Sequence, residues 1–204
     1  MTKTVSGLDI DANFQFYITN LRGQDFKWNI PFKTYMKYRR RTRLFPNSND
    51  NFRKFVTPTE NIIKDIVRDI IIGNIESRLD YAQLVMDFVN RIPYQDRKEE
   101  YTKYPVETLC EFGGNCVDMS VLGATMLSLG GIETCFIDFP DHLALGVNIP
   151  TKGEYVIYRG EKYYVAEMSS TPTLSRDSAQ IKIGDTLGLD LNEAKIYTAR
   201  PKKS

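Results

Sequence analysis

Two stretches in the first half of the chain repeat apolar residues at the spacing of an amphipathic helix. In the first, the apolar positions before Gly73 are Ile62, Ile63, Ile66, Val67, Ile70 and Ile71. Thr57, Pro58 and Glu60 precede them in the order of an N-cap, a first-turn proline and a capping box, so we expect this helix to begin at Pro58. A second stripe predicts a helix over residues 77–91 that ends before Pro93; its apolar positions are Tyr81, Val85, Phe88 and Ile92.

A third helix is predicted over residues 116–129, and it differs from the first two because almost all of its positions are apolar. Asp118 is the single charged residue within it, and Gly130 and Gly131 follow as a break. A helix without a charged face is typical of a buried central element, so we expect it to lie inside the fold.

Alternating apolar and polar positions predict strands at both ends of the chain. Near the N-terminus, two strand-like runs flank a polar break, and Phe26, Trp28 and Ile30 alternate with polar residues in the second run. In the C-terminal half, the runs ETCFIDF, HLALGVNI, EYVIYRG and EKYYVAEM predict successive antiparallel strands, and residues 181–183 are a further candidate. Helices followed by a sheet with a central helix packed on it are typical of an α+β domain.

Length and charge limit the classes of protein to consider. The 204 residues fit one domain, and 27 Lys and Arg against 26 Asp and Glu argue against a nucleic-acid partner. The basic run at residues 37–43 is therefore better explained as a solvated helix face than as a nucleic-acid patch. No apolar run reaches a membrane span of about 18 residues. The N-terminal residues lack the apolar core of a signal peptide, so we expect a cytoplasmic protein, although a chain without its original leader would look the same.

The three cysteines have no C-x-x-C spacing, which favours free thiols over a disulfide framework. Cys135 lies in a predicted strand and is expected in the core, and Cys110 is expected in a packed turn. The alternative for Cys110 is a redox-regulating pair with Cys116. One histidine and three scattered cysteines offer no ligand spacing for a metal, and no cofactor is expected.

One cysteine follows two glycines and an asparagine at the predicted start of the third helix. Gly113 and Gly114 allow a tight turn of the backbone, and Asn115 is a favourable N-cap for the helix. Cys116 is then placed at a helix N-terminus, where unpaired N–H groups and the positive end of the dipole favour a thiolate and can bind an oxyanion. These features fit a catalytic thiol. The alternative is a small buried residue that happens to begin a helix.

The single histidine, His142, lies in the stretch PDHLALGVN. On a strand it shares one face with Ala144, Gly146 and Asn148, which are small enough to leave room for a neighbouring side chain or a substrate. His142 is therefore a candidate general base, and a packed structural histidine is the alternative.

An acid that orients the imidazole would complete a catalytic triad. Glu167 is the candidate, because it shares an apolar strand face with Val165 and an acid in such a place needs a partner. A glutamate on an edge strand that points into water is the alternative. Asp138 and Asp141 are rivals, but they lie so close to His142 in the sequence that a strand would aim them poorly.

These motifs, in this order, resemble the transglutaminase-like superfamily, and above all its prokaryotic, notably archaeal, members. The matching motifs are Gly-Gly-Asn-Cys-Val-Asp at 113–118, Asp-His at 141–142 and Tyr-Tyr-Val-Ala-Glu at 163–167. The resemblance extends to FVNRIPY and YPVETL, and more loosely to WNIP and VTPTE. It is firm over residues 77–170.

The resemblance implies a papain-like α+β core, with the cysteine on a central helix that packs against an antiparallel sheet. This core would occupy residues 57–170, with 1–56 as an N-terminal strand and helix extension and 171–204 as a C-terminal tail that completes the single domain. By matching positions, Cys116 is the nucleophile, His142 the general base and acid, and Glu167 the orienting acid. The implied activity is thiol-dependent acyl transfer or hydrolysis at an amide or peptide bond of a protein or peptide substrate.

Family members commonly carry acidic residues where this chain has Asn115 and Val117, on either side of Cys116. These differences motivate an alternative function, a catalytically silent module that binds a protein or peptide. Tyr94, Gln95 and Asn115 are candidates for oxyanion or substrate binding by position alone. The sequence leaves the oligomeric state open.

Overall fold

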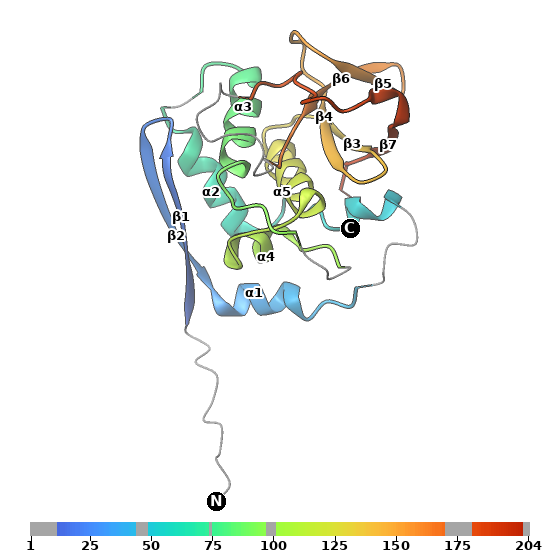
Figure 1. Cartoon of the computed structure of the whole chain (residues 1–204). Coiled ribbons are helices and arrows are strands. Elements are labelled where there is room, and N and C mark those ends of the chain that lie inside the picture. Colours follow the sequence, from blue (N-terminus) through green and yellow to red (C-terminus); the bar gives the residue numbers. More distant parts are fainter. Residues whose placement is uncertain (1–11, 44–48, 74, 97–100, 170–180, 202–204) are drawn as a thin grey trace, which may run out of the picture.

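The computed structural model describes residues 12–43, 49–73, 75–96, 101–169 and 181–201. They form an α+β fold, in which a hairpin and the helices come first along the chain and a five-stranded antiparallel sheet comes last (Figure 1). The α+β class predicted from the sequence is therefore confirmed. No helix within the described residues is long and apolar enough to cross a membrane.

The N-terminal hairpin confirms the two strands predicted there. β1 (Asn13–Leu21) pairs antiparallel with β2 (Gln24–Pro31) and lies along the helical side of the molecule (Figure 1). Trp28 and Ile30 alternate with exposed residues and are buried, as the period-two pattern predicts. The Trp28 indole Nε1 donates a hydrogen bond of 2.9 Å to Asp69, which fixes the hairpin to the neighbouring helix α2 (Asn61–Ile71).

The basic run at residues 37–43 is only partly a solvated helix face. α1 (Phe32–Arg39) ends within it, and Arg40 is exposed. Arg43, in contrast, has a side chain only 13% exposed and forms an ion pair with the fully buried Glu107. The prediction is wrong for Arg43, because its partner lies 64 residues away in the sequence and a buried carboxylate requires a nearby cation.

The first of the two predicted amphipathic helices begins later than expected. After a short 3-10 helix, η1 (Asn49–Lys54), α2 starts at Asn61 and not at Pro58. The predicted capping box does not form, because the Glu60 carboxylate accepts hydrogen bonds of 2.7 Å from Lys37 and from Tyr38 instead of reaching back along the chain. α3 (Arg78–Val89) agrees with the prediction, and the Ser77 side chain caps it.

The central helix is the element that the sequence predicted best. After the short α4 (Pro105–Cys110), α5 (Cys116–Leu129) has the predicted bounds, and residues 118–127 are all buried. It contacts α2, α3 and α4 on one side and strands β3 (Thr134–Asp138) and β4 (Leu143–Val147) on the other. Figure 1 shows α5 between these helices and the sheet, so its apolar surface is covered all round.

The sheet has the strand order β5-β6-β4-β3-β7, and every neighbouring pair is antiparallel. The four predicted strands are confirmed, but β4 pairs with β6 (Glu161–Ala166) and leaves β5 (Tyr155–Tyr158) at the edge. Residues 181–183 are not a strand, because the Ile183 N–H donates to the Gln83 side chain and the Lys182 N–H to Asp185. The strand that was missed is β7 (Lys195–Thr198), which follows the 3-10 helix η2 (Leu191–Glu193).

Candidate active site

The loop before α5 is fixed by a reciprocal pair of hydrogen bonds. The Asn115 side chain accepts from the Asp118 N–H at 3.1 Å, and the Asp118 carboxylate accepts from the Asn115 N–H at 3.1 Å. The N-cap predicted for Asn115 is confirmed, and Asp118 adds the second half of a capping box. Cys116 is the first residue of the helix, half-buried, and its place is set by these two side chains.

The two glycines serve close packing and not the tight turn that the sequence suggested. Neither has a positive φ; the left-handed residue of this loop is Phe112, at φ 45°. A Cβ on Gly114 would lie 2.6 Å from the Asp118 Cβ, and a Cβ on Gly113 would lie 2.2 Å from the Gln95 side chain. The backbone therefore approaches both neighbours more closely than any other residue type would allow.

His142 lies just before β4, at the end of the turn that joins β3 to β4. Its main-chain carbonyl accepts a 2.8 Å hydrogen bond from the Phe139 N–H, which closes the turn. The predicted open face beside His142 does not exist: a Cβ on Gly146 would lie 2.7 Å from the Cys135 sulfur and 2.8 Å from Tyr163. Small residues are required there because the sheet packs a second apolar cluster on that side.

The imidazole of His142 interacts with both predicted triad partners. Its Nε2 lies 2.7 Å from a Glu167 carboxylate oxygen. Burial lowers the pKa of His142, but the interactions of the ring with Cys116 and Glu167 outweigh burial and raise the pKa to about 10. The structure thus brings Cys116, His142 and Glu167 together, with the histidine between the other two.

Glu167 follows the last residue of β6 and is 3% exposed, which rules out the alternative of a glutamate that points into water. Its second carboxylate oxygen accepts hydrogen bonds from the Ser169 N–H at 2.8 Å and the Ser169 hydroxyl at 2.9 Å. The Asn90 side chain donates to its main-chain carbonyl at 3.0 Å. Both carboxylate oxygens are therefore engaged, and the acid is held in one orientation toward His142.

Ser120 links the two elements that carry the cysteine and the histidine. It is fully buried one turn into α5, and its hydroxyl donates a 2.9 Å hydrogen bond to the main-chain carbonyl of Leu143, the first residue of β4. No local pattern around Ser120 predicts this contact. Together with the apolar packing of α5 on the sheet, it holds the start of α5 against the start of β4.

A cavity of about 530 Å³ opens in front of Cys116 and His142. Its walls come from the first turn of α5, the turn between β3 and β4, and the region around β7, which contributes Glu193 and Lys195. Asp138 and Asp141, the rivals of Glu167, lie on its walls, while the imidazole nitrogen is paired with Glu167. A second cavity of about 540 Å³, beside α3, has neither cysteine nor histidine in its lining.

Tyr94 lies beside the nucleophile candidate, whereas Gln95 supports the loop. Residues 94 and 114 form a parallel β-bridge, and the Gln95 N–H donates to the Gly114 carbonyl at 2.9 Å. Burial, the largest cause, raises the pKa of Tyr94, and the charges of Cys116 and Asp96 add to it. Tyr94 thus lies beside the loop that leads to Cys116, while the Gln95 side chain packs over Gly113.

The other two cysteines have a different environment. Burial raises the pKa of the Cys110 and Cys135 thiols to about 12. Cys135 is fully buried, as expected of a core residue, and all three cysteines are free thiols. A redox pair between Cys110 and Cys116 stays a prediction.

The comparisons with family models and with curated proteins identify no relative of this chain. No known family model matches the chain, and no curated protein matches it. Among the described residues, no three histidine, cysteine or acidic side chains gather in a way that could hold a metal ion. The interpretation of function therefore rests on the arrangement of Cys116, His142 and Glu167.

Proposed function

We propose that this protein is a thiol-dependent enzyme that transfers or hydrolyses an acyl group at an amide or peptide bond, with Cys116 as nucleophile, His142 as general base and acid, and Glu167 as orienting acid. The observation that carries the proposal is the position of His142, whose Nε2 lies 2.7 Å from the buried Glu167 carboxylate and whose side chain lines the same cavity as Cys116. A nucleophile, a base and an orienting acid in this order are the signature of nucleophilic catalysis.

The chemistry follows from the protonation of this group. The raised pKa of His142 means an imidazolium at neutral pH, which is the charge partner that a catalytic thiolate requires. The thiolate attacks the carbonyl carbon, and the tetrahedral oxyanion forms near the Cys116 N–H and the Tyr94 hydroxyl. The His142 imidazolium then donates its proton to the leaving amine, and the carbon–nitrogen bond breaks to leave a thioester.

The second half of the reaction releases the acyl group. Neutral His142 accepts a proton from an incoming water while the water oxygen attacks the thioester carbon, and the thiolate of Cys116 leaves. The products are a carboxylic acid and the original thiolate–imidazolium pair. An amine in place of water would give transfer or cross-linking; we favour hydrolysis because no feature of the sequence marks an amine-acceptor site.

The fold supports the same proposal at a coarser level. We infer that the chain has the papain-like core of the transglutaminase-like superfamily, because the cysteine begins a buried central helix and the histidine precedes a strand of the antiparallel sheet on which that helix packs. A catalytically silent binding module would have the same fold. The buried, doubly hydrogen-bonded Glu167 favours the enzyme, since a binding module does not need a fixed acid behind a histidine.

A peptide-library screen tests this proposal. The wild-type protein is expected to cleave a subset of peptides, and Cys116→Ala is expected to lose all turnover because no other group can form the thioester. Cys110→Ala is the matched control, since Cys110 is a half-buried thiol at the end of α4, outside the cavity that Cys116 lines, and it should retain wild-type turnover. Equal cleavage by wild type and Cys116→Ala would exclude the assignment.

A further inference from the structure

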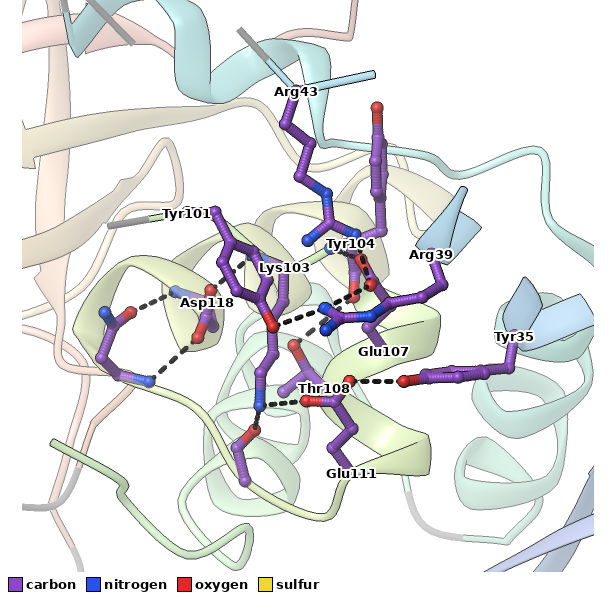
Figure 2. Close-up of polar contacts among 12 residues, drawn as sticks. Tyr35, Arg39, Arg43, Tyr101, Lys103, Tyr104, Glu107, Thr108, Glu111 and Asp118 are labelled. Carbon is purple, nitrogen blue, oxygen red and sulfur yellow. Dashed lines mark hydrogen bonds and ion pairs between the residues drawn. The ribbon is translucent and has the colours of Figure 1, made fainter. Parts of the chain in front are cut away.

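Lys103 is a lysine in an unusual place, 1% exposed in the segment that leads into α4. Lysine is almost never fully buried unless its charge is paired, so its partners indicate why it is there. Figure 2 shows the Lys103 side chain running down between the α5 cap on one side and α4 on the other.

The ammonium group holds the loop that precedes the nucleophile. Lys103 Nζ donates a 2.8 Å hydrogen bond to the main-chain carbonyl of Gly113, three residues before Cys116. The same nitrogen forms a 2.8 Å ion pair with Glu111, whose other carboxylate oxygen accepts from the Tyr35 hydroxyl at 2.8 Å. The ammonium is thus fixed by Glu111 and in turn fixes Gly113.

The main chain of Lys103 holds the other end of the same loop. Its N–H donates a 2.7 Å hydrogen bond to one oxygen of the fully buried Asp118 carboxylate. The second oxygen accepts from the Asn115 N–H in the capping box. Lys103 therefore hydrogen-bonds to residues 113–118 on both sides of Cys116. Its side chain bonds to Gly113, and its backbone N–H bonds to Asp118.

The helix that precedes Glu111, α4, is itself held in place by a second buried ion pair. Glu107, on α4 and fully buried, pairs with Arg43 and accepts a 2.9 Å hydrogen bond from the Tyr104 N–H (Figure 2). This pair ties α4 to the segment after α1. Because α4 cannot shift without breaking that pair, the Glu111 carboxylate is a rigid anchor for the Lys103 ammonium.

We propose that Lys103 is a positioning residue that sets the place of the Cys116 sulfur and N–H relative to His142. The proposal rests on the proposed function of Cys116. A buried ion pair contributes little net stability compared with apolar residues of the same volume, so a structural role alone is a weak reason for a lysine here. Its hydrogen bond to Gly113 provides something that an apolar side chain does not, a fixed backbone in the loop before the nucleophile.

The test compares Lys103→Met with Lys64→Met, which changes an exposed lysine on α2. The measurement is the rate of alkylation of Cys116 by iodoacetamide between pH 5 and 9, resolved by mass spectrometry, at a temperature well below each variant's Tm. Lys103→Met is expected to react about 10- to 100-fold more slowly than wild type at pH 6, because a displaced sulfur loses its contact with His142. Lys64→Met should follow the wild-type profile.

The double variant Lys103→Met/Glu111→Gln separates positioning from charge. It removes both charges of the pair, so its Tm is expected to lie above that of Lys103→Met, in which Glu111 is left half-buried without its cation. The alkylation rate of Cys116 in the double variant should nevertheless stay low at pH 6, because nothing replaces the hydrogen bond to Gly113. If Lys103→Met does not fold, the double variant gives the answer.

A wild-type pH profile of Cys116 alkylation in either variant would overturn the inference. A double variant that recovers both the wild-type Tm and the wild-type alkylation rate would also overturn it, because Lys103 would then serve only to neutralise Glu111. The wild-type protein itself reports on the proposed function: a Cys116 that reacts at pH 6 no faster than a model thiol contradicts that function, and the inference falls with it. Enhanced wild-type reactivity that persists unchanged in the variants contradicts the inference alone.

Discussion

Iodoacetamide at pH 6 is expected to alkylate Cys116 and to leave Cys110 and Cys135 unmodified. The thiolate is the reactive form, and the thiols of Cys110 and Cys135, with pKa values raised to about 12, hold about one thiolate in a million at that pH. Cys116 sits at the N-terminus of α5 beside an imidazole whose pKa is raised to about 10, so an imidazolium neighbours it throughout the neutral range. A helix N-terminus and a neighbouring imidazolium are features of reactive cysteines in general, and the expected result rests on them.

Peptide mass spectrometry after timed alkylation measures all three cysteines in one sample, so Cys110 and Cys135 serve as internal controls. His142→Ala removes the neighbouring cation and should slow Cys116 at pH 6 by about 10-fold or more, to the rate of an ordinary thiol whose pKa is about 8.5. A wild-type Cys116 that needs pH 8 or above to react would show that the helix and the histidine do not act on it.

Glu167→Gln is expected to keep the fold and to cost most of the turnover. Glutamine retains an oxygen that can accept from Ser169, but it removes the negative charge that helps to hold the proton on His142. By analogy with other triads, the loss of an orienting acid lowers turnover by about 10⁴-fold while the geometry is kept. The pKa of His142 should fall as well, because its hydrogen bond and Coulomb attraction to the carboxylate are lost.

Glu161→Gln is the matched control, an exposed glutamate at the start of β6, and it should leave turnover unchanged. Glu167→Asp should also impair the enzyme, because the shorter side chain cannot span the same 2.7 Å contact to His142 while it keeps its bonds to Ser169. Turnover of any peptide cleaved by the wild type, with the His142 titration measured in parallel, tests both. Unchanged rates in Glu167→Gln would mean that another group orients the ring.

The sequence predicted the elements whose cause is local. α5 has the expected bounds because its apolar surface, its N-cap Asn115 and the glycines after it are all encoded within 20 residues. The start of α2 was wrong because Glu60 bonds to Lys37 and Tyr38, and a local capping pattern cannot reveal such distant competitors. β7 was missed because it is a four-residue edge strand, and its pairing with β3 spans most of the C-terminal half.

In the candidate site too, features with a local cause could be predicted from the sequence and others could not. Cys116, His142 and Glu167 were predicted because each is a reactive residue type in a place that local pattern could flag, and the structure places His142 beside Glu167 and on the same cavity as Cys116, although the strand face expected to be open is packed. Lys103, Ser120 and Ser169 were not found. The contacts of Lys103 and Ser120 depend on how different segments of the fold meet, whereas Ser169 bonds to Glu167 only two residues away; a lysine or serine is too common in sequences to signal any of these roles.

An NMR titration of the imidazole tests most directly whether Cys116, His142 and Glu167 work as one group. The chain has one histidine, so its imidazole carbon–proton signals belong to His142 without further assignment. In the wild type, the ring is expected to stay protonated through neutral pH and to titrate near the raised pKa of about 10; in Cys116→Ala the pKa should fall, because the hydrogen bond and charge of Cys116 are lost. A wild-type histidine that titrates near the ordinary value of about 6.5, and that does so equally in Cys116→Ala, would contradict the proposed catalytic group.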